Sequence, residues 1–148
     1  MIKHISIKTK LGWISAYENN GKIIEIKFGK LKKQINSPIL KNFKTNIVKF
    51  LNNKISYIKV PHEIKGNINQ KKVWSELKKI KKGKTKSYGE IAKKHKLSPR
   101  YVGKICSQNK LLLLVPCHRV IRANGDIGGF TSIGGIKLKK KILKLERA

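Results

Sequence analysis

The stretch KTKSYGEIAKKHKLSPR, residues 84–100, carries the start signals of two short helices joined by a tight turn. Ser87 followed three residues later by Glu90 fits a capping box, in which a side-chain hydroxyl accepts a hydrogen bond from the first turn of a helix. Ser98 before Pro99 offers a second N-cap, with proline in the first helical position. We expect a helix-turn-helix here, because two short helices with a tight turn on a basic chain are typical of that unit.

The composition of the whole chain agrees with a nucleic-acid partner. Its 148 residues contain 36 Lys and Arg against seven Asp and Glu, which gives a formal net charge of +29 and a pI near 10.4. A genome rich in A and T would favour lysine, isoleucine and asparagine codons, but the same bias would also favour glutamate, which is scarce. The cationic excess therefore indicates a polyanionic partner, and nucleic acid fits it better than an anionic membrane surface.

The length suits one ordinary domain or two very small ones. Alternating apolar residues before residue 30 indicate strands with a turn at Asn19-Asn20-Gly21, and apolar residues spaced by three or four over 40–51 indicate a helix. The polar residues 62–69 resemble a linker. We predict a small α/β lobe with a short antiparallel sheet and one helix, followed by a mainly helical lobe. The predicted boundaries are residues 1–65 and 66–148.

Two further helices are expected in the second lobe. Apolar residues from 73 to 80 predict one, and residues 136–145 predict a closing amphipathic helix. Its inward side is expected to consist of Leu138, Ile142 and Leu145. The lysine-rich stretches 78–86 and 137–144 are interpreted as solvated faces, of which some lysines contact phosphate.

The chain shows no signal for a membrane or for secretion. Its longest apolar run, residues 111–116, is too short for a span, and its first residues lack the apolar region of a signal peptide. The two cysteines, Cys106 and Cys117, suit a reducing cytoplasm rather than a disulfide scaffold. No Cys/His group has zinc spacing. We expect a cytoplasmic protein located with the DNA, with no membrane contact, no metal and no cofactor.

Cys117 is the candidate nucleophile. A free thiol has a pKa of roughly 8.5, so attack on carbon requires a base or a nearby positive charge. His118 follows directly and is the candidate base, and Glu146 is the carboxylate that a closing helix could return to it. Taken alone, such a pair is more often a buried cysteine beside a surface histidine, because neighbours on an extended chain point in opposite directions.

The string Pro-Cys-His-Arg-Val, residues 116–120, resembles the active-site signature of the O6-alkylguanine-DNA alkyltransferases, the methylated-DNA–protein-cysteine methyltransferases. Residues 84–100, Asn109, the Gly-Gly-Phe loop at 128–130 and a closing helix ending in Glu146 follow in the order of that family. The resemblance is strong from about residue 73 onward and weaker before it. It implies an α/β front lobe and a winged-helix-like helix-turn-helix lobe that carries the active site.

The resemblance also implies the reaction. Cys117 resembles the acceptor that takes the alkyl group from O6 of guanine in double-stranded DNA, and O4 of alkylated thymine is a further candidate substrate. His118 resembles the water-linked base and Glu146 the carboxylate that orients it. Asn109 matches the residue that braces the turn between the recognition helix and the active-site strand. We expect a monomer that reacts once, because a thioether has no evident route back to thiolate.

Residues expected to contact DNA or the flipped base follow from the same resemblance. Tyr88 matches a tyrosine that crowds the phosphate of the target nucleotide, and Arg100 matches an arginine that enters the duplex in place of the base. The remaining DNA-binding candidates are Ser98, Tyr101, Gly103 and Arg119. The candidates for the walls of the base pocket are Val115, Val120, Phe130 and Thr131.

Three positions depart from the pattern of the family. Phe130 stands where a tyrosine hydroxyl is common, so Thr131, Ser132 or a backbone N–H is left to hydrogen-bond the departing O6. Tyr101 replaces a small residue and Lys110 replaces a proline. The departures concern rate, substrate size and docking depth, and they leave the acceptor thiol in place.

Two other classes of function remain open at this stage. An alkyltransferase-like protein marks lesions without repairing them, but such proteins replace the acceptor cysteine. A basic repressor or ribosomal component would use the charge and the helix-turn-helix, but neither needs the sequence around Cys117.

Overall fold

The computed structural model describes residues 1–129 and 134–147. Its N-terminal part is an antiparallel sheet of β1 (Lys3–Thr9), β2 (Gly12–Asn19) and β3 (Lys22–Phe28), in that order. The turn between β2 and β3 contains Asn20 and Gly21, both with positive φ, 52° and 79°. Asparagine and glycine tolerate this left-handed backbone, which gives the turn the twist of the two strands.

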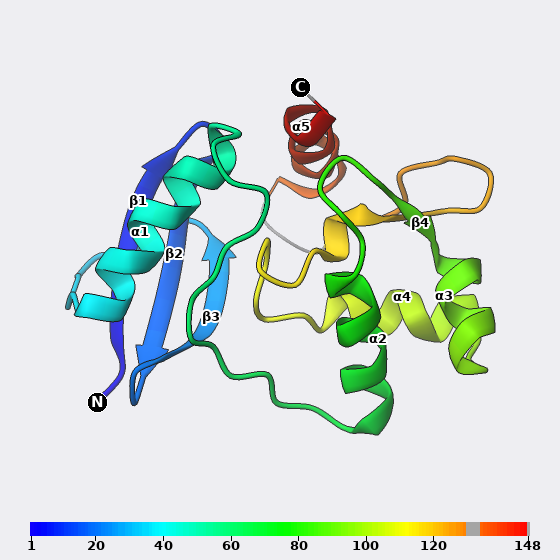
Figure 1. Ribbon diagram of the computed structural model, residues 1–148, viewed down its shortest axis with the longest axis horizontal. Coiled ribbons are helices and arrows are strands. Elements are labelled where there is room, and N and C mark those ends of the chain that lie inside the picture. The colour runs from blue at the N-terminus through cyan, green and yellow to red at the C-terminus, as the bar shows by residue number, and fades with distance from the viewer. Residues whose placement is uncertain (130–133, 148) are drawn as a thin grey trace.

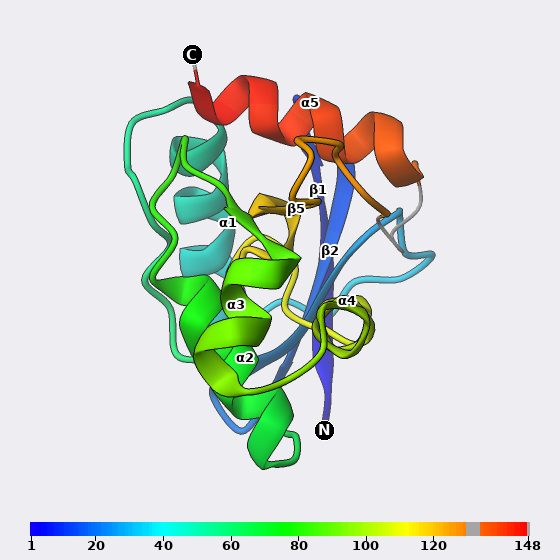
Figure 2. The ribbon, with the colours of Figure 1, turned by 90° about the vertical axis from the view of Figure 1, so that its right-hand side faces the viewer.

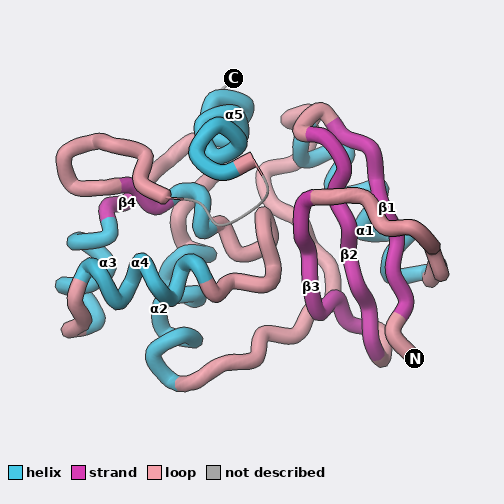
Figure 3. The backbone as a smooth tube through the Cα atoms, turned by 180° about the vertical axis from the view of Figure 1, so that it is seen from behind, coloured by secondary structure: helices cyan, strands magenta, loops and turns pink. Residues whose placement is uncertain are grey.

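One helix covers one face of this sheet, as Figures 1 and 3 show from opposite sides. It is α1 (Pro38–Leu51), which begins at Ser37, whose hydroxyl accepts a hydrogen bond from Leu40 N at 3.1 Å. The side chains of Leu40, Phe43 and Ile47 are fully buried against the strands. The sheet and α1 together are called the sheet lobe below.

The helical lobe comprises α2 (Ile68–Lys78), α3 (Tyr88–His95), α4 (Pro99–Ser107) and α5 (Gly135–Arg147). A two-stranded parallel sheet pairs β4 (Lys86–Ser87) with β5 (Val120–Ile121), and the short helix η1 (Cys117–Arg119) precedes β5. Figures 1 and 2 show α5 lying across one end of the molecule, close to the C-terminal end of α1. Buried apolar residues form one contiguous core through both lobes.

The helix-turn-helix predicted from residues 84–100 is present as α3 and α4. Ser87 accepts from Glu90 N at 3.0 Å and Ser98 accepts from Tyr101 N at 3.1 Å, so both serines cap the helices that they were expected to begin. Lys96 ends α3 in the left-handed conformation, with φ 55°.

The connection between the lobes differs from the expected polar linker. His62 lies beside β3, where Ile23 N donates to Pro61 O at 2.8 Å and Glu63 N donates to Ile23 O at 2.9 Å. The following helix already begins at Ile68, because Asn67 and Gln70 form a complete capping box. The connection is therefore bound to the sheet by backbone hydrogen bonds. The polar side chains of this segment gave no indication of them.

Residues 111–115 form a tight turn, in which Val115 N donates to Leu111 O at 2.8 Å and Leu113 has a φ of 69°. The expected inward side of α5 needs correction, because the helix is rotated. Leu138 and Leu145 are half-buried, whereas the fully enclosed residues are Lys139, Ile142, Leu143 and Glu146.

Candidate active site

Cys117 begins η1 and is buried, with only 6% of its surface exposed. Its backbone N–H donates to Val115 O at 2.8 Å, which holds it close to the turn that precedes it. The residue lines a cavity of about 750 Å³ beside the recognition helix α4. Further lining residues come from α3, α4 and the loop after β5, and they include Tyr88, Arg100, Gly103, Cys106 and Arg122.

Burial raises the pKa of the Cys117 thiol, because a thiolate is poorly solvated inside the protein. A hydrogen bond from the Asn109 side chain and the positive charge of Lys139 act in the opposite direction. Asn109 also donates from Nδ2 to Val115 O at 2.8 Å and accepts from Leu111 N at 2.9 Å. It thus braces the turn before Cys117 from both ends.

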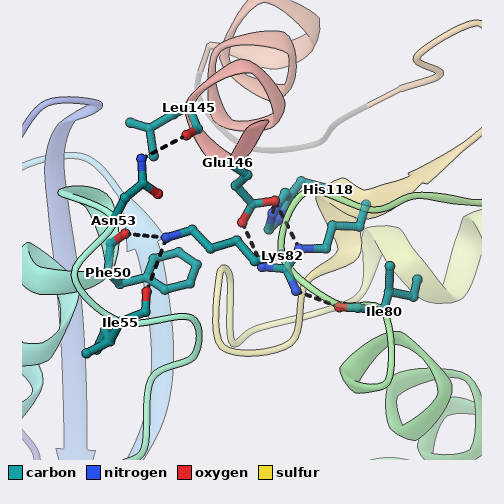
Figure 4. Close-up of polar contacts among 9 residues, drawn as sticks. Phe50, Asn53, Ile55, Ile80, Lys82, His118, Leu145 and Glu146 are labelled. Carbon is teal, nitrogen blue, oxygen red and sulfur yellow. Dashed lines mark hydrogen bonds and ion pairs between the residues drawn. The ribbon is translucent and has the colours of Figure 1, made fainter. Parts of the chain in front are cut away.

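His118 and Arg119, which follow Cys117 in the sequence, form a buried cluster with Glu146 of α5. Figure 4 shows His118 and Glu146 pointing toward one another. His118 Nε2 lies 3.0 Å from Glu146 Oε1. Arg119 binds the same carboxylate through two nitrogens, with Nε 3.0 Å from Oε1 and Nη2 2.7 Å from Oε2. Its remaining Nη1 donates to Ile80 O at 2.6 Å, which anchors the cluster to the end of α2.

The charges of this cluster follow from its geometry. Burial alone would raise the pKa of Glu146, but hydrogen bonds from His118 and Arg119 bring it down to about 2. The carboxylate is therefore ionised and accepts the Nε2–H of His118. Burial lowers the pKa of His118, and the neighbouring Glu146 partly opposes this, so the imidazole is neutral near pH 7.

Arg119, which the sequence interpretation had placed among the DNA contacts, is buried in the interior. Its side chain is only 7% exposed and binds Glu146 and Ile80. The physical reason is the η1 turn: consecutive residues of a short helix both reach one carboxylate, which an extended chain would not allow. Arg119 therefore binds the same carboxylate as the candidate base.

Lys139 is a central residue that the sequence interpretation missed, since it placed residues 137–144 on a solvated face. Its side chain is fully buried, and Nζ donates to Val120 O at 2.7 Å and to Gly129 O at 3.2 Å. Burial lowers its pKa to about 8. Lys139 shares a helical stripe with Ile142 and Glu146, and that spacing of three and four was the available signal.

Tyr88 stands at the wall of the cavity between two glycines. A Cβ on Gly128 would lie 3.2 Å from its ring, and a Cβ on Gly103 would lie 3.8 Å from it. Lys139 Nζ lies 3.4 Å from the Tyr88 hydroxyl, and burial raises the pKa of this tyrosine to about 12. The ring is therefore packed in one position and its hydroxyl is neutral.

The other expected DNA contacts lie at the start of α4. Arg100 is exposed at the edge of the cavity, and Gly103 lines it one turn further on. Ser98 is exposed but its hydroxyl is used as the N-cap of α4, and Tyr101 is half-buried against the core. Arg122, exposed at the same cavity, is a further cation that the sequence interpretation did not single out.

Of the four expected wall residues, two can be placed. Val115 and Val120 are buried behind the site, at 1% and 0% exposure, and neither is among the residues that line the cavity around Cys117. The backbone carbonyls of both are engaged, by Asn109 and Lys139 respectively. Phe130 and Thr131 lie outside the described residues.

Neither a metal site nor a membrane span is found in the part of the chain that the structure describes. Among residues 1–129 and 134–147, no three His, Cys, Asp or Glu side chains gather as metal ligands. None of the helices within those residues has the length and apolar character needed to cross a bilayer.

Comparison with known proteins gives this arrangement a family. Residues 69–148 match the family described as 6-O-methylguanine DNA methyltransferase, DNA binding domain. A methylated-DNA–protein-cysteine methyltransferase of Methanocaldococcus vulcanius is 41% identical over 86% of this chain and 74% of its own. A methyltransferase of the same name from Metallosphaera sedula is 32% identical over 99% of this chain and 94% of its own.

Solved structures agree in fold as well. Mycobacterium tuberculosis OGT in complex with DNA superposes with a TM-score of 0.87 at 25% identity, over 97% of this chain and 92% of that one. An O6-methylguanine DNA methyltransferase of Methanococcus jannaschii gives a TM-score of 0.70 at 26% identity, over 97% and 93%. The matched region contains α3, α4, Cys117 and Glu146, and on this evidence the chain belongs to the 6-O-methylguanine DNA methyltransferase family.

Proposed function

We propose that this protein repairs alkylated DNA by transferring the alkyl group from O6 of guanine to the sulfur of Cys117. The observation that carries the proposal is a buried thiol that lines a cavity bordered by the recognition helix and is followed in the sequence by a histidine that an ionised glutamate holds. The names of its relatives describe the same chemistry, methyl transfer from DNA to a protein cysteine.

The proton of the thiol needs an acceptor before the sulfur can attack. Because His118 Nε2 donates to Glu146, Nδ1 is the ring nitrogen free to take a proton, relayed from Cys117 through a water. Glu146 then stabilises the imidazolium that forms. Lys139 and Asn109 favour the thiolate in the meantime, since both lower the pKa of Cys117.

The transfer itself is an in-line displacement. The bond between Cys117 Sγ and the alkyl carbon forms while the bond from that carbon to O6 breaks, and the guanine leaves with a proton. The product is a thioether, so each protein molecule reacts once. We expect Thr131, Ser132 or a backbone N–H to hydrogen-bond the departing O6. These groups lie outside the described residues.

The depth of the thiol supports base flipping. A cavity of about 750 Å³ holds a single nucleotide but no stacked duplex, so the alkylated base has to leave the helix to reach Cys117. Arg100 at the exposed start of α4 is suited to fill the vacancy in the stack, and Tyr88 is suited to crowd the phosphate. Exposed lysines supply sequence-independent contacts to the backbone.

We further propose a division of work between residues 1–65 and 66–148. All described residues that line the cavity around Cys117 come from the second segment. The described part of the site comes from one chain, and we expect a monomer to be active on double-stranded DNA.

O4 of alkylated thymine also presents an alkyl carbon on an exocyclic oxygen, and we extend the proposal to it as a second substrate.

Mass spectrometry tests the proposal directly. The purified protein is mixed with a duplex bearing O6-methylguanine, and the Cys117 peptide is expected to gain one methyl group per protein molecule. Cys117→Ala should bind the duplex without transfer, and Cys106→Ala, which removes the other buried cysteine, should still transfer. Binding without methylation of Cys117 in the unaltered protein would overturn the proposal in favour of a lesion-marking protein. A parallel duplex with O4-methylthymine tests the second substrate.

A further inference from the structure

The C-terminal ends of α1 and α5 meet beside Glu146, although the two helices belong to different lobes (Figure 4). The last turn of a helix leaves backbone carbonyls without partners in the helix and carries a partial negative charge. Two such ends and an ionised carboxylate therefore face one another, and the arrangement requires cations and donors from elsewhere.

Lys82, from the loop between α2 and β4, supplies the first of these. Its Nζ donates to Phe50 O at 2.6 Å and to Ile55 O at 3.2 Å, at the end of α1 and just after it. It also lies 4.1 Å from the centre of the Phe50 ring. The interaction joins a loop of the helical lobe to the sheet lobe. Lys82 was expected on a solvated face, and the structure contradicts this.

Asn53 supplies a second hydrogen-bond donor to these helix ends. Its Nδ2 donates to Leu145 O at 3.2 Å, across the lobes and directly before Glu146 in the sequence. Asn53 has a φ of 57°, a left-handed conformation that asparagine tolerates better than most residues. The backbone of Gly83 completes the contact, since a Cβ there would lie 3.3 Å from Glu146 O.

Lys82 is also coupled to the cluster electrostatically. Burial lowers its pKa, and the negative charge of Glu146 acts in the opposite direction. The charges that shift the pKa of His118 are those of Glu146, Arg119 and Lys139. An effect of Lys82 on the candidate base therefore passes through the position of Glu146.

We propose that Lys82 is a positioning residue for alkyl transfer: by fastening its loop to the end of α1, it holds the neighbouring Gly83 against the end of α5 and keeps Glu146 at the distance at which His118 can act as a base. Asn53 supports it from the sheet lobe. The sheet lobe lines no part of the Cys117 cavity that the structure describes, and this contact gives it a role in the reaction. The inference rests on the proposed function.

The reason to expect an effect on rate is the geometry of the pair. The carboxylate of Glu146 must stay within hydrogen-bond distance of an imidazole that is itself fixed by packing. A shift of the end of α5 by a fraction of an ångström to an ångström weakens that bond. The imidazolium then forms less readily, and deprotonation of Cys117 requires a higher pH.

The experiment compares Lys82→Met with Lys82→Arg and with Lys81→Met. Lys81 is the exposed neighbour, so its replacement removes the same charge from the same loop without touching α1. Single-turnover rates are measured with O6-benzylguanine as a free base, which removes DNA binding and base flipping from the rate. They are recorded from pH 6 to 9, after thermal melts have shown that each variant is folded at the assay temperature.

Lys82→Met should slow transfer by about tenfold, because a small misplacement of a catalytic group costs between tenfold and a hundredfold. Its rate profile should move to higher pH by about half a unit or more, because a thiolate that loses a neighbouring imidazolium forms only at a higher pH. Lys82→Arg should recover most of both changes, and Lys81→Met should match the unaltered protein. An unchanged profile for Lys82→Met, or the same loss in Lys81→Met, would overturn the inference.

Asn53→Gly gives an independent check, because glycine keeps the left-handed conformation while removing the Nδ2 donor. We expect a smaller loss of rate with a shift in the same direction, and a rate equal to that of the unaltered protein would exclude a role for Asn53. The two proposals fail differently. If the unaltered protein does not transfer at all, the proposed function is wrong; if it transfers and Lys82→Met is normal, only the positioning role is wrong.

Discussion

Two glutamates, Glu76 in α2 and Glu146 in α5, are buried to a similar degree and have the same pKa of about 2, yet their surroundings differ. In each case burial alone would raise the pKa, and hydrogen bonds from cationic neighbours reverse the effect. Glu76 receives hydrogen bonds from Lys94 and His95, whereas Glu146 receives them from His118 and Arg119.

The partners of the two carboxylates are unlike in exposure. Around Glu76, Lys79 is 66% exposed, Lys94 56% and Lys86 41%. Around Glu146, the His118 side chain is 1% exposed and that of Arg119 7%. Exposed lysines can exchange places around a carboxylate with little cost, but buried partners have one arrangement.

The difference shows that a lowered pKa does not identify a catalytic group. Glu76 joins α2 to α3 and β4 under the helix-turn-helix, so its charge is used for structure. Glu146 accepts a hydrogen bond from one imidazole, and in the proposed mechanism its charge serves the reaction. The same carboxyl-to-amide change at both positions separates these two uses.

Glu146→Gln should have the largest effect on both stability and transfer. An amide leaves the Arg119 cation buried without an ionised partner, which destabilises the fold by about 3 kcal/mol or more. Transfer should fall by about a hundredfold or more, because the base loses the anion that stabilises its protonated form. Denaturant unfolding and single-turnover transfer at a temperature where the variant is folded measure the two losses.

The matched change Glu76→Gln should destabilise the protein. The molecules that remain folded should transfer the alkyl group at the rate of the unaltered protein. If both variants slowed transfer equally, the distinction between the two clusters would be lost. A normal rate in Glu146→Gln would remove Glu146 from the mechanism and leave it a structural residue like Glu76.

Acid unfolding should show the two carboxylates together. Each pKa is lowered from 4.5 to about 2 on folding, so the stabilisation is complete above pH 4.5 and is lost as the pH falls towards 2. For Glu146 the shift corresponds to stability on the order of 3 kcal/mol. The free energy of unfolding, measured between pH 5 and 2, should fall less steeply in each amide variant. An unchanged slope in Glu146→Gln would mean that the carboxylate is not ionised in the folded state at pH 5.

Arg119→Lys should destabilise the fold by about 1.5 to 3 kcal/mol, because lysine cannot reproduce the two-nitrogen contact with Glu146 or the bond to Ile80 O. It should leave the affinity for undamaged duplex and its dependence on salt unchanged, since Arg119 is buried. Arg100→Ala is the comparison, because Arg100 is exposed at α4 and its loss should weaken binding. A reduced salt dependence in Arg119→Lys would restore the DNA contact first expected from the sequence.

How much of the fold and of the candidate site could be predicted depended on how far apart in the sequence the interacting residues lie. Ser87 and Ser98 were placed correctly because an N-cap is decided within four residues. Cys117, His118 and Glu146 were grouped by a specific motif and its family resemblance, and the structure brings the histidine and the glutamate together. Their roles in the reaction remain predictions.

The contacts of Arg119, Lys139 and Lys82 could not be predicted in this way. Arg119 and Lys139 are buried and Lys82 is half-buried, and each cation binds carbonyls or a carboxylate that lie far away in the sequence, such as Ile80 O for Arg119 and Phe50 O for Lys82. In a chain with 36 basic residues, a lysine that faces inward has no local signal to distinguish it from its solvated neighbours.

The smallest effect is expected from a single lysine beside Glu76. Lys94→Met should cost no more than about 1 kcal/mol, because Lys79, Lys86 and His95 remain within reach of the carboxylate. Lys93→Met, one residue away on the exposed side of α3, controls for the loss of charge. A loss in Lys94→Met as large as that in Arg119→Lys would show that the cluster around Glu76 is as rigid as the one around Glu146, and exposure of the partners would no longer separate a structural carboxylate from a catalytic one.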